Sequence, residues 1–85
     1  MAEKKVVVNL QTGLHARPAA KFVQEANKFT AEIYIMNGSK KVNAKSIMGI
    51  MSIAVSKGTE ITIVADGLDE VEAVDALVQL VSLSE

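Results

Sequence analysis

The spacing of apolar residues switches repeatedly between alternation and a helical period, and this pattern limits the fold more than any other feature of the chain. Alternation typical of half-buried strands covers residues 4–10, 31–36 and 61–65. Helical spacing covers residues 16–27 and 71–81. Because each amphipathic helix has a single apolar stripe to bury, the pattern predicts one sheet with its helices collected on one face.

Turn and cap signals supply the elements in the middle of the chain. The dipeptide Asn37-Gly38 is a strong signal for a tight hairpin, from which a strand over residues 40–43 is expected to return. Ser46 is suited to be the N-cap of a short helix that extends to Ala54. The middle of the chain is therefore predicted to form a hairpin followed by a short helix.

The last helix has its own start signal, because Asp69 followed by Glu72 fits a capping box with aspartate in place of serine. The complete order of elements is then β-α-β-β-α-β-α. This pattern does not give the order of strands within the sheet. A ferredoxin-like sheet, as in small ligand-sensing domains, shares the first six elements and is the main competing topology.

Two helical stripes are expected to contribute much of the core. The stripe of the first helix comprises Ala16, Ala19, Ala20, Val23 and Ala26, with Phe22 at its flank. The stripe of the last helix comprises Val71, Val74, Leu77, Val78 and Val81.

Size and hydropathy limit the class of protein. A chain of 85 residues is expected to form one domain spanning residues 1–85. No apolar run approaches the roughly 20 residues of a membrane span. The run Val6–Val8 is too short and too early for the apolar region of a signal peptide. We therefore expect a soluble cytoplasmic protein without membrane insertion.

Residue chemistry argues against metals, cofactors and nucleic acid. The chain has no cysteine and a single histidine, which leaves little to ligate a metal, and it contains no catalytic triad or nucleotide-binding loop. Its net charge of −1 and its three aromatic residues offer neither a basic face nor a stacking surface for nucleic acid. We expect no bound metal, no cofactor and no direct nucleic-acid partner.

The single histidine, His15, lies at the predicted start of the first helix beside an arginine. Pro18 falls in the first turn, where its missing N–H costs nothing, and Gly13 gives the backbone freedom just before the helix. Free backbone N–H groups and the helix dipole favour an anion there, and the Arg17 guanidinium adds donors suited to phosphate oxygens. This arrangement suits a histidine that receives a phosphoryl group.

The positive field should also hold His15 neutral near neutral pH, which leaves a ring nitrogen free to attack phosphorus. On residue chemistry alone, however, a histidine at a helix start is more often a cap or a surface residue than a reactive group.

The short helix after Ser46 is apolar nearly all round, so both of its sides cannot face one sheet. Ile47, Met48 and Met51 form one side, and they either pack under a loop or remain exposed as a docking patch. Ser46 itself is either a plain N-cap or a phosphorylation site whose added negative charge the helix dipole would tolerate.

Two motifs resemble those of a known family. The segments TGLHARPAA at residues 12–20 and KSIMGIMS at residues 45–52 closely resemble HPr, the histidine-containing phosphocarrier family of the bacterial phosphoenolpyruvate:sugar phosphotransferase system. The resemblance covers essentially the whole chain. It implies an α+β open-faced sandwich, in which three helices cover one face of a four-stranded antiparallel sheet.

The resemblance also implies a function. His15 would accept a phosphoryl group on Nδ1 from enzyme I and pass it to the IIA domains of sugar permeases, while Arg17 steadies the group. The protein would be a stoichiometric carrier and not an enzyme.

A regulatory site is implied as well. Ser46 would be phosphorylated by the HPr kinase/phosphorylase, and the serine-phosphorylated form would bind the catabolite control repressor. The residues implied to contact partners are Leu14, Ala16, Ala20, Ile47, Met48 and Met51.

A second function within the same family stays open. The catabolite-repression paralogue Crh keeps the serine site but has glutamine in place of the histidine, so it regulates without carrying phosphoryl groups. Residues 22–27 and 41–45 resemble that paralogue more than HPr, whereas position 15 is histidine. A third, different function would be a ferredoxin-like domain that binds a small metabolite.

Overall fold

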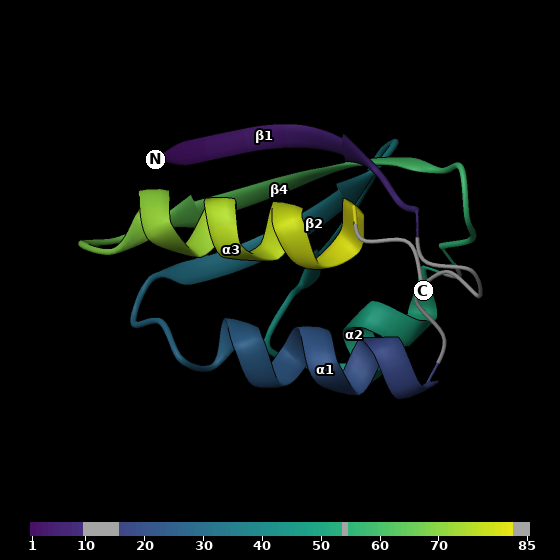
Figure 1. Cartoon of the computed structure of the whole chain (residues 1–85), viewed down its shortest axis with the longest axis horizontal. Helices are drawn as coiled ribbons and strands as arrows, with labels where there is room; N and C mark the ends of the chain where they lie inside the picture. The colour runs from purple at the N-terminus through teal and green to yellow at the C-terminus, as the bar shows by residue number, and fades with distance from the viewer. Residues whose placement is uncertain (10–15, 54, 83–85) are drawn as a thin grey trace.

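The computed structural model describes residues 1–9, 16–53 and 55–82, apart from the side chains of Ala16 and Arg17. These residues form a sheet with helices on one face (Figure 1). In this part of the chain the sheet has four strands in the order β1-β4-β2-β3, and every neighbouring pair is antiparallel. The strands are β1 (Ala2–Val7), β2 (Glu32–Asn37), β3 (Lys40–Asn43) and β4 (Glu60–Asp66). The expected α+β open-faced sandwich is confirmed.

The position of β1 excludes the competing topology. Within the described ranges β1 lies at an edge of the sheet and pairs with β4 alone. A ferredoxin-like sheet instead places its first strand in the interior, beside its third. The final strand therefore lies between β1 and β2, and the last helix packs against both β1 and β4.

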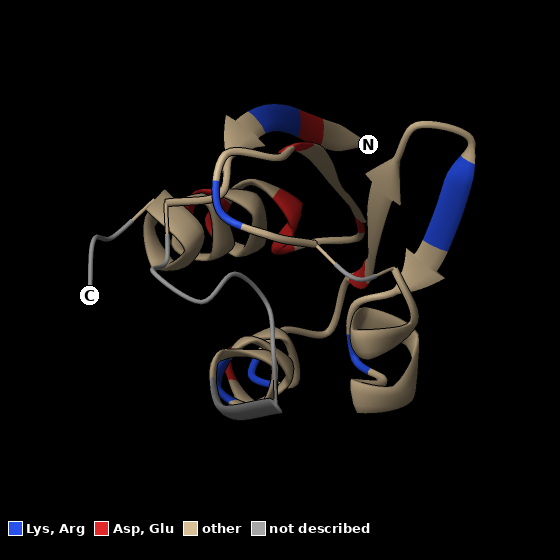
Figure 2. Cartoon of the chain, turned by 90° about the vertical axis from the view of Figure 1, so that its right-hand side faces the viewer, with Lys and Arg blue, Asp and Glu red and all other residues tan. Residues whose placement is uncertain are grey.

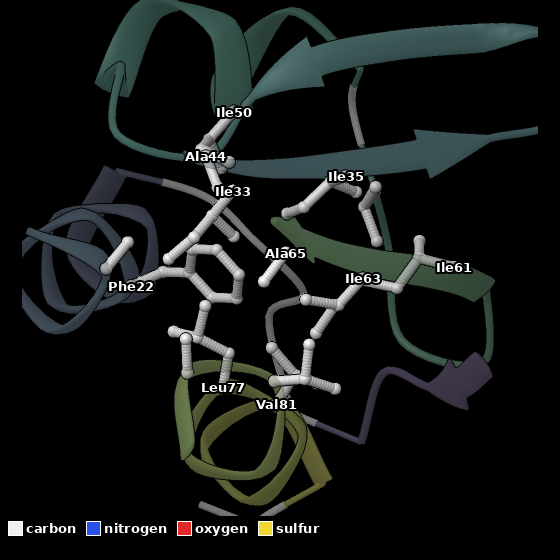
Figure 3. Packing of buried hydrophobic residues seen from close by; sticks show 14 of the residues in the cluster. Phe22, Ile33, Ile35, Ala44, Ile50, Ile61, Ile63, Ala65, Leu77 and Val81 are labelled. Carbon is white, nitrogen blue, oxygen red and sulfur yellow. The ribbon is translucent and has the colours of Figure 1, made fainter. Parts of the chain in front are cut away.

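The helices cover the sheet as one layer. They are α1 (Ala16–Ala26), α2 (Ile47–Ser52) and α3 (Glu70–Ser82). The α1 helix contacts both α2 and α3, so it forms the centre of the layer. The core lies between this layer and the sheet, where Phe22 of α1 points between Ile33 of β2 and Leu77 of α3 (Figure 3).

The predicted hairpin is confirmed, and the predicted first strand is shifted. Asn37 pairs with Lys40 across a two-residue turn in which Gly38 has a φ of 64°. The first strand begins at Ala2 and ends at Val7, earlier than the predicted residues 4–10. Its register with β4 sets these limits, because Ala2 already lies opposite Ala65. Leu10, at the end of the predicted strand, lies outside the described residues.

The predicted stripes of α1 and α3 need one correction each. Phe22 is fully buried and not at the flank, because the small side chains of Ala19 and Ala26 leave the space between α1 and the sheet for its ring. Val71 was expected in the core but is 56% exposed. Ala73 takes the inward position in that turn, and Val71 lies about 200° away from it around the helix.

The predicted capping box of the last helix is also wrong, because the Asp69 side chain binds other partners than the first turn of α3. The Asp69 carboxylate accepts hydrogen bonds from the N–H of Thr30 and of Ala31, both at 2.9 Å, so it binds the turn after α1. The two turns touch closely, since a Cβ on Gly67 would lie 2.7 Å from the Cα of Ala31. Asp69 therefore joins the β4–α3 turn to the α1–β2 turn.

This carboxylate should make stability depend on pH. The hydrogen bond from the Thr30 backbone, aided by that from Ala31, lowers the pKa of Asp69 below its ordinary value of 3.8. A lowered pKa in the folded state contributes stability that is fully present above 3.8 and is lost as the pH falls through the folded-state pKa. We expect Asp69→Asn to lower the urea midpoint at neutral pH, and the gap from wild type to shrink in acid. A gap that is constant with pH would contradict this role.

Candidate functional site

The helices that carry the two predicted motifs, α1 and α2, pack against each other in the helical layer. The α2 helix lies beside the N-terminal half of α1 in two perpendicular views (Figures 1 and 2). The short connection after β3 fixes this placement, because Ala44, between β3 and α2, is fully buried and its N–H donates to the carbonyl of Ile33. The connection thereby holds α2 beside α1.

The residues predicted at the start of α1 are only partly described. Leu14 and His15 lie outside the described residues, and so do the side chains of Ala16 and Arg17. The helix begins at Ala16, as predicted, so His15 directly precedes its first residue in the sequence. Pro18 lies in the first turn, where it was expected. Ala20, on the second turn, is half-buried.

Ser46 is the N-cap of α2, as predicted. Its Oγ accepts a hydrogen bond from the N–H of Gly49 at 3.2 Å, and its backbone is extended, with φ −114° and ψ 119°. Its carbonyl accepts from the N–H of Ile50 at 3.0 Å. The side chain is half-buried, and its hydroxyl hydrogen is not used in the bond to Gly49.

Two neighbours of Ser46, which the sequence interpretation did not single out, build this cap. The side-chain Oδ1 of Asn43 accepts from the N–H of Lys45 at 2.8 Å, and the Asn43 carbonyl accepts from the N–H of Ser46 at 3.2 Å. The Lys45 ammonium reaches back to the carbonyl of Phe29 at 2.7 Å. An asparagine two residues before the bonded N–H is a known turn signal and could have been noticed.

One of the two apolar sides of α2 is exposed, and the other is buried. Ile50 and Ile53 face the core, whereas Ile47, Met48 and Met51 are exposed. The structure therefore decides between the two sequence interpretations, because these three side chains do not pack under a loop. We name Ile47, Met48 and Met51 the α2 patch.

The chain matches the sequence profile of a known family. The profile, described as the PTS HPr component phosphorylation site, matches residues 2–82. The chain belongs to the HPr family. This family comprises phosphocarriers of the phosphotransferase system and related Crh regulators, so the expected family is confirmed, together with a general connection to that system.

Individual relatives come from both branches of the HPr family. The HPr-like protein Crh of Halalkalibacterium halodurans is 59% identical over 81 residues, which cover 95% of this chain and 96% of that protein. The crystal structure of a phosphocarrier protein HPr from Bacillus anthracis matches with a TM-score of 0.92 and 56% identity, covering 94% of this chain and 95% of the other.

A Crh crystal structure differs more from this chain than the Bacillus anthracis HPr structure does. The Crh of Bacillus subtilis, described as a dimer with a swapping domain, is 59% identical and covers 95% of this chain and 93% of its own. Its TM-score is 0.77. The overall arrangement of this chain is therefore closer to the Bacillus anthracis HPr, although sequence identity is slightly higher to Crh.

Among the described residues, the groups with clearly shifted pKa values are the Met1 ammonium, Asp69 and Glu70, which lie outside α1 and α2. The ammonium of Met1 lies 2.8 Å from Glu70, and this contact raises the pKa of the amine and lowers the pKa of the carboxyl. Among the residues that the structure describes, no group of three acidic, histidine or cysteine side chains could hold a metal ion. In the same ranges, no helix has the length and apolar character needed to cross a bilayer.

Proposed function

We propose that this protein carries phosphoryl groups through His15, taking them from phospho-enzyme I and delivering them to the IIA domains of sugar permeases. The observation that carries the proposal is the histidine itself, which directly precedes the first residue of α1 in a chain of the HPr family. Of the residue types in this motif, only imidazole offers a neutral nitrogen nucleophile near neutral pH.

The transfer needs positioning more than proton chemistry. Nδ1 of His15 attacks phosphorus in line, and the bond from phosphorus to enzyme I breaks as the new nitrogen–phosphorus bond forms. The free N–H groups at the start of α1 and the guanidinium of Arg17 stabilise the charge on the equatorial oxygens. In a second transfer, a nucleophile of the IIA domain attacks phosphorus and the bond to Nδ1 breaks. The free histidine is regenerated, so the protein is a carrier and not an enzyme.

Ser46 supplies the regulatory half of the proposal. Phosphorylation by the HPr kinase/phosphorylase would add a charge of about −1.5 to −2 at the start of α2. The extended backbone of Ser46 and its place before the first helical residue support this, because a phosphate there adds negative charge where the helix dipole favours it. The fold should therefore persist, and the catabolite control repressor would recognise the modified surface.

A Crh-like regulator is the second candidate function. It is supported by the 59% identity to the Crh of Halalkalibacterium halodurans. The serine that such a regulator would need is present as Ser46. Such a regulator would act through phospho-Ser46 alone and leave His15 idle. The presence of histidine at position 15 favours the carrier.

The stability of the bound phosphate distinguishes the two functions. With enzyme I and labelled phosphoenolpyruvate, a carrier is expected to gain one acid-labile phosphate, because phosphohistidine hydrolyses in acid. With the HPr kinase/phosphorylase and ATP, it is expected to gain an acid-stable phosphate at Ser46. Absence of acid-labile label in a folded protein with intact His15 would reject carrier function and leave the Crh-like regulator.

A further inference from the structure

All four methionines of this chain lie outside the core. Met1 is 78% exposed, Met36 36%, Met48 76% and Met51 45%, whereas the buried cluster consists of aliphatic side chains and Phe22. The chain has no cysteine, so these thioethers are the only sulfur atoms that an oxidant could modify.

Two of the methionines occupy the α2 patch. Met48 and Met51 are three residues apart and so share one side of the short helix, next to Ser46. Met1 and Met36 lie elsewhere, around a shallow pocket of about 310 Å³ that is also lined by Tyr34 and Val64 of the sheet. The chain thus contains a strongly exposed and a partly exposed methionine at each of two separate places.

We propose that Met48 and Met51 are oxidation sites that switch off docking at the α2 patch. The proposal rests on the proposed function, and on the partner contact that the family resemblance implies for this patch. Hydrogen peroxide is the oxidant: its terminal oxygen bonds to the thioether sulfur, the O–O bond breaks, and water leaves. The sulfur loses two electrons and becomes a sulfoxide, which methionine sulfoxide reductases can reverse.

The loss of docking follows from the polarity of the sulfoxide. Methionine gives a docking surface a flexible apolar side chain that adapts to several partners. A sulfoxide oxygen buried against an apolar partner surface lacks a hydrogen-bond donor, which weakens binding by about tenfold for each side chain. Neither Met48 nor Met51 belongs to the buried cluster, so the fold should survive the modification.

The test combines peroxide treatment with matched variants. Peptide mass mapping of the treated full-length protein is expected to show one added oxygen on Met48 and on Met51. Initial rates of phosphoryl transfer from phospho-enzyme I, measured well below saturation, should then fall at least about tenfold. The double variant Met48→Leu with Met51→Leu should keep its own untreated rate after the same treatment, and Met36→Leu should lose activity as wild type does.

The outcomes separate this inference from the proposed function. Untreated protein that accepts no phosphoryl group contradicts both. Untreated protein that is active, and that keeps its rate once Met48 and Met51 are oxidised, contradicts only the switch. A rate that falls together with the circular dichroism signal also overturns the switch, because unfolding and not altered docking would then be the cause. If the double variant has a low basal rate, Met48→Leu and Met51→Leu are compared singly, and each should lose less of its own untreated rate on oxidation than wild type does.

Discussion

Replacing Phe22 with alanine is expected to lower the free energy of unfolding by about 3–5 kcal/mol. Phe22 is fully buried, and its ring lies between the helical layer and the sheet, near Ile33 and Leu77 (Figure 3). Its neighbours on α1 along the buried side are alanines, whose short side chains cannot fill the space that the ring would leave. The loss would be a large part of the roughly 5–15 kcal/mol that stabilises a typical domain.

The other phenylalanine of the chain is a matched control. Phe29 follows α1, is half-buried and packs against the margin of the core. Phe29→Ala should therefore cost clearly less than Phe22→Ala. Equilibrium unfolding in urea measures both, and an unchanged m-value would indicate that the native compactness is kept. Equal losses for the two variants would contradict the central place of Phe22 in the core.

The sequence was sufficient for the order and type of elements but not for the arrangement of strands. Alternation identified β4 and the hairpin because each strand buries one face, and Asn37-Gly38 fixed the turn between β2 and β3. The pairing of β1 with β4 joins distant parts of the chain, and a local pattern contains no record of it. The family resemblance supplied the open-faced architecture that the periodicity left undetermined.

Two side chains differ from the sequence prediction, one because of its size and the other because its hydrogen-bond partners are distant in the chain. Periodicity treats Phe22 and the alanines of α1 alike, but only the large ring can span the space to the sheet. Asp69 has the sequence context of a cap, yet its oxygens bind backbone N–H groups that are 38 and 39 residues away in the chain. Such partners become visible only when the chain is folded.

In the candidate site too, local features could be predicted from the sequence, whereas features set by distant contacts could not. The N-cap at Ser46 could be predicted because its bond to the N–H of Gly49 is local. Exposure of the α2 patch could not, since a helix that is apolar nearly all round gives no preferred side, and the contacts of α2 with α1 and β3 decide it. The hydrogen bond from the Lys45 ammonium to the carbonyl of Phe29 was also missed, because the two residues are 16 positions apart in the chain.

Replacing His15 with glutamine is expected to abolish acid-labile phosphorylation by enzyme I completely. The amide nitrogen of glutamine has its lone pair delocalised into the carbonyl, so it cannot attack phosphorus as imidazole does. Arg17→Ala should leave the nucleophile in place and remove donors that stabilise the transferring group, which slows transfer by about 10²–10³-fold. The measurement is the rate at which label from phosphoenolpyruvate enters the protein, with acid lability assayed afterwards.

Ser46→Ala is the control for this loss, because it should keep the acid-labile label and lose the acid-stable one. The opposite behaviour is expected of His15→Gln, which should still be phosphorylated at Ser46 by the HPr kinase/phosphorylase. The described hydrogen bonds of the Ser46 cap come from Asn43 and Gly49, which His15→Gln leaves unchanged. Acid-labile label that persists in His15→Gln would place the acceptor elsewhere and reject His15 as the carrier residue. Loss of both labels in a variant that keeps the wild-type circular dichroism spectrum would contradict the expected independence of the two sites.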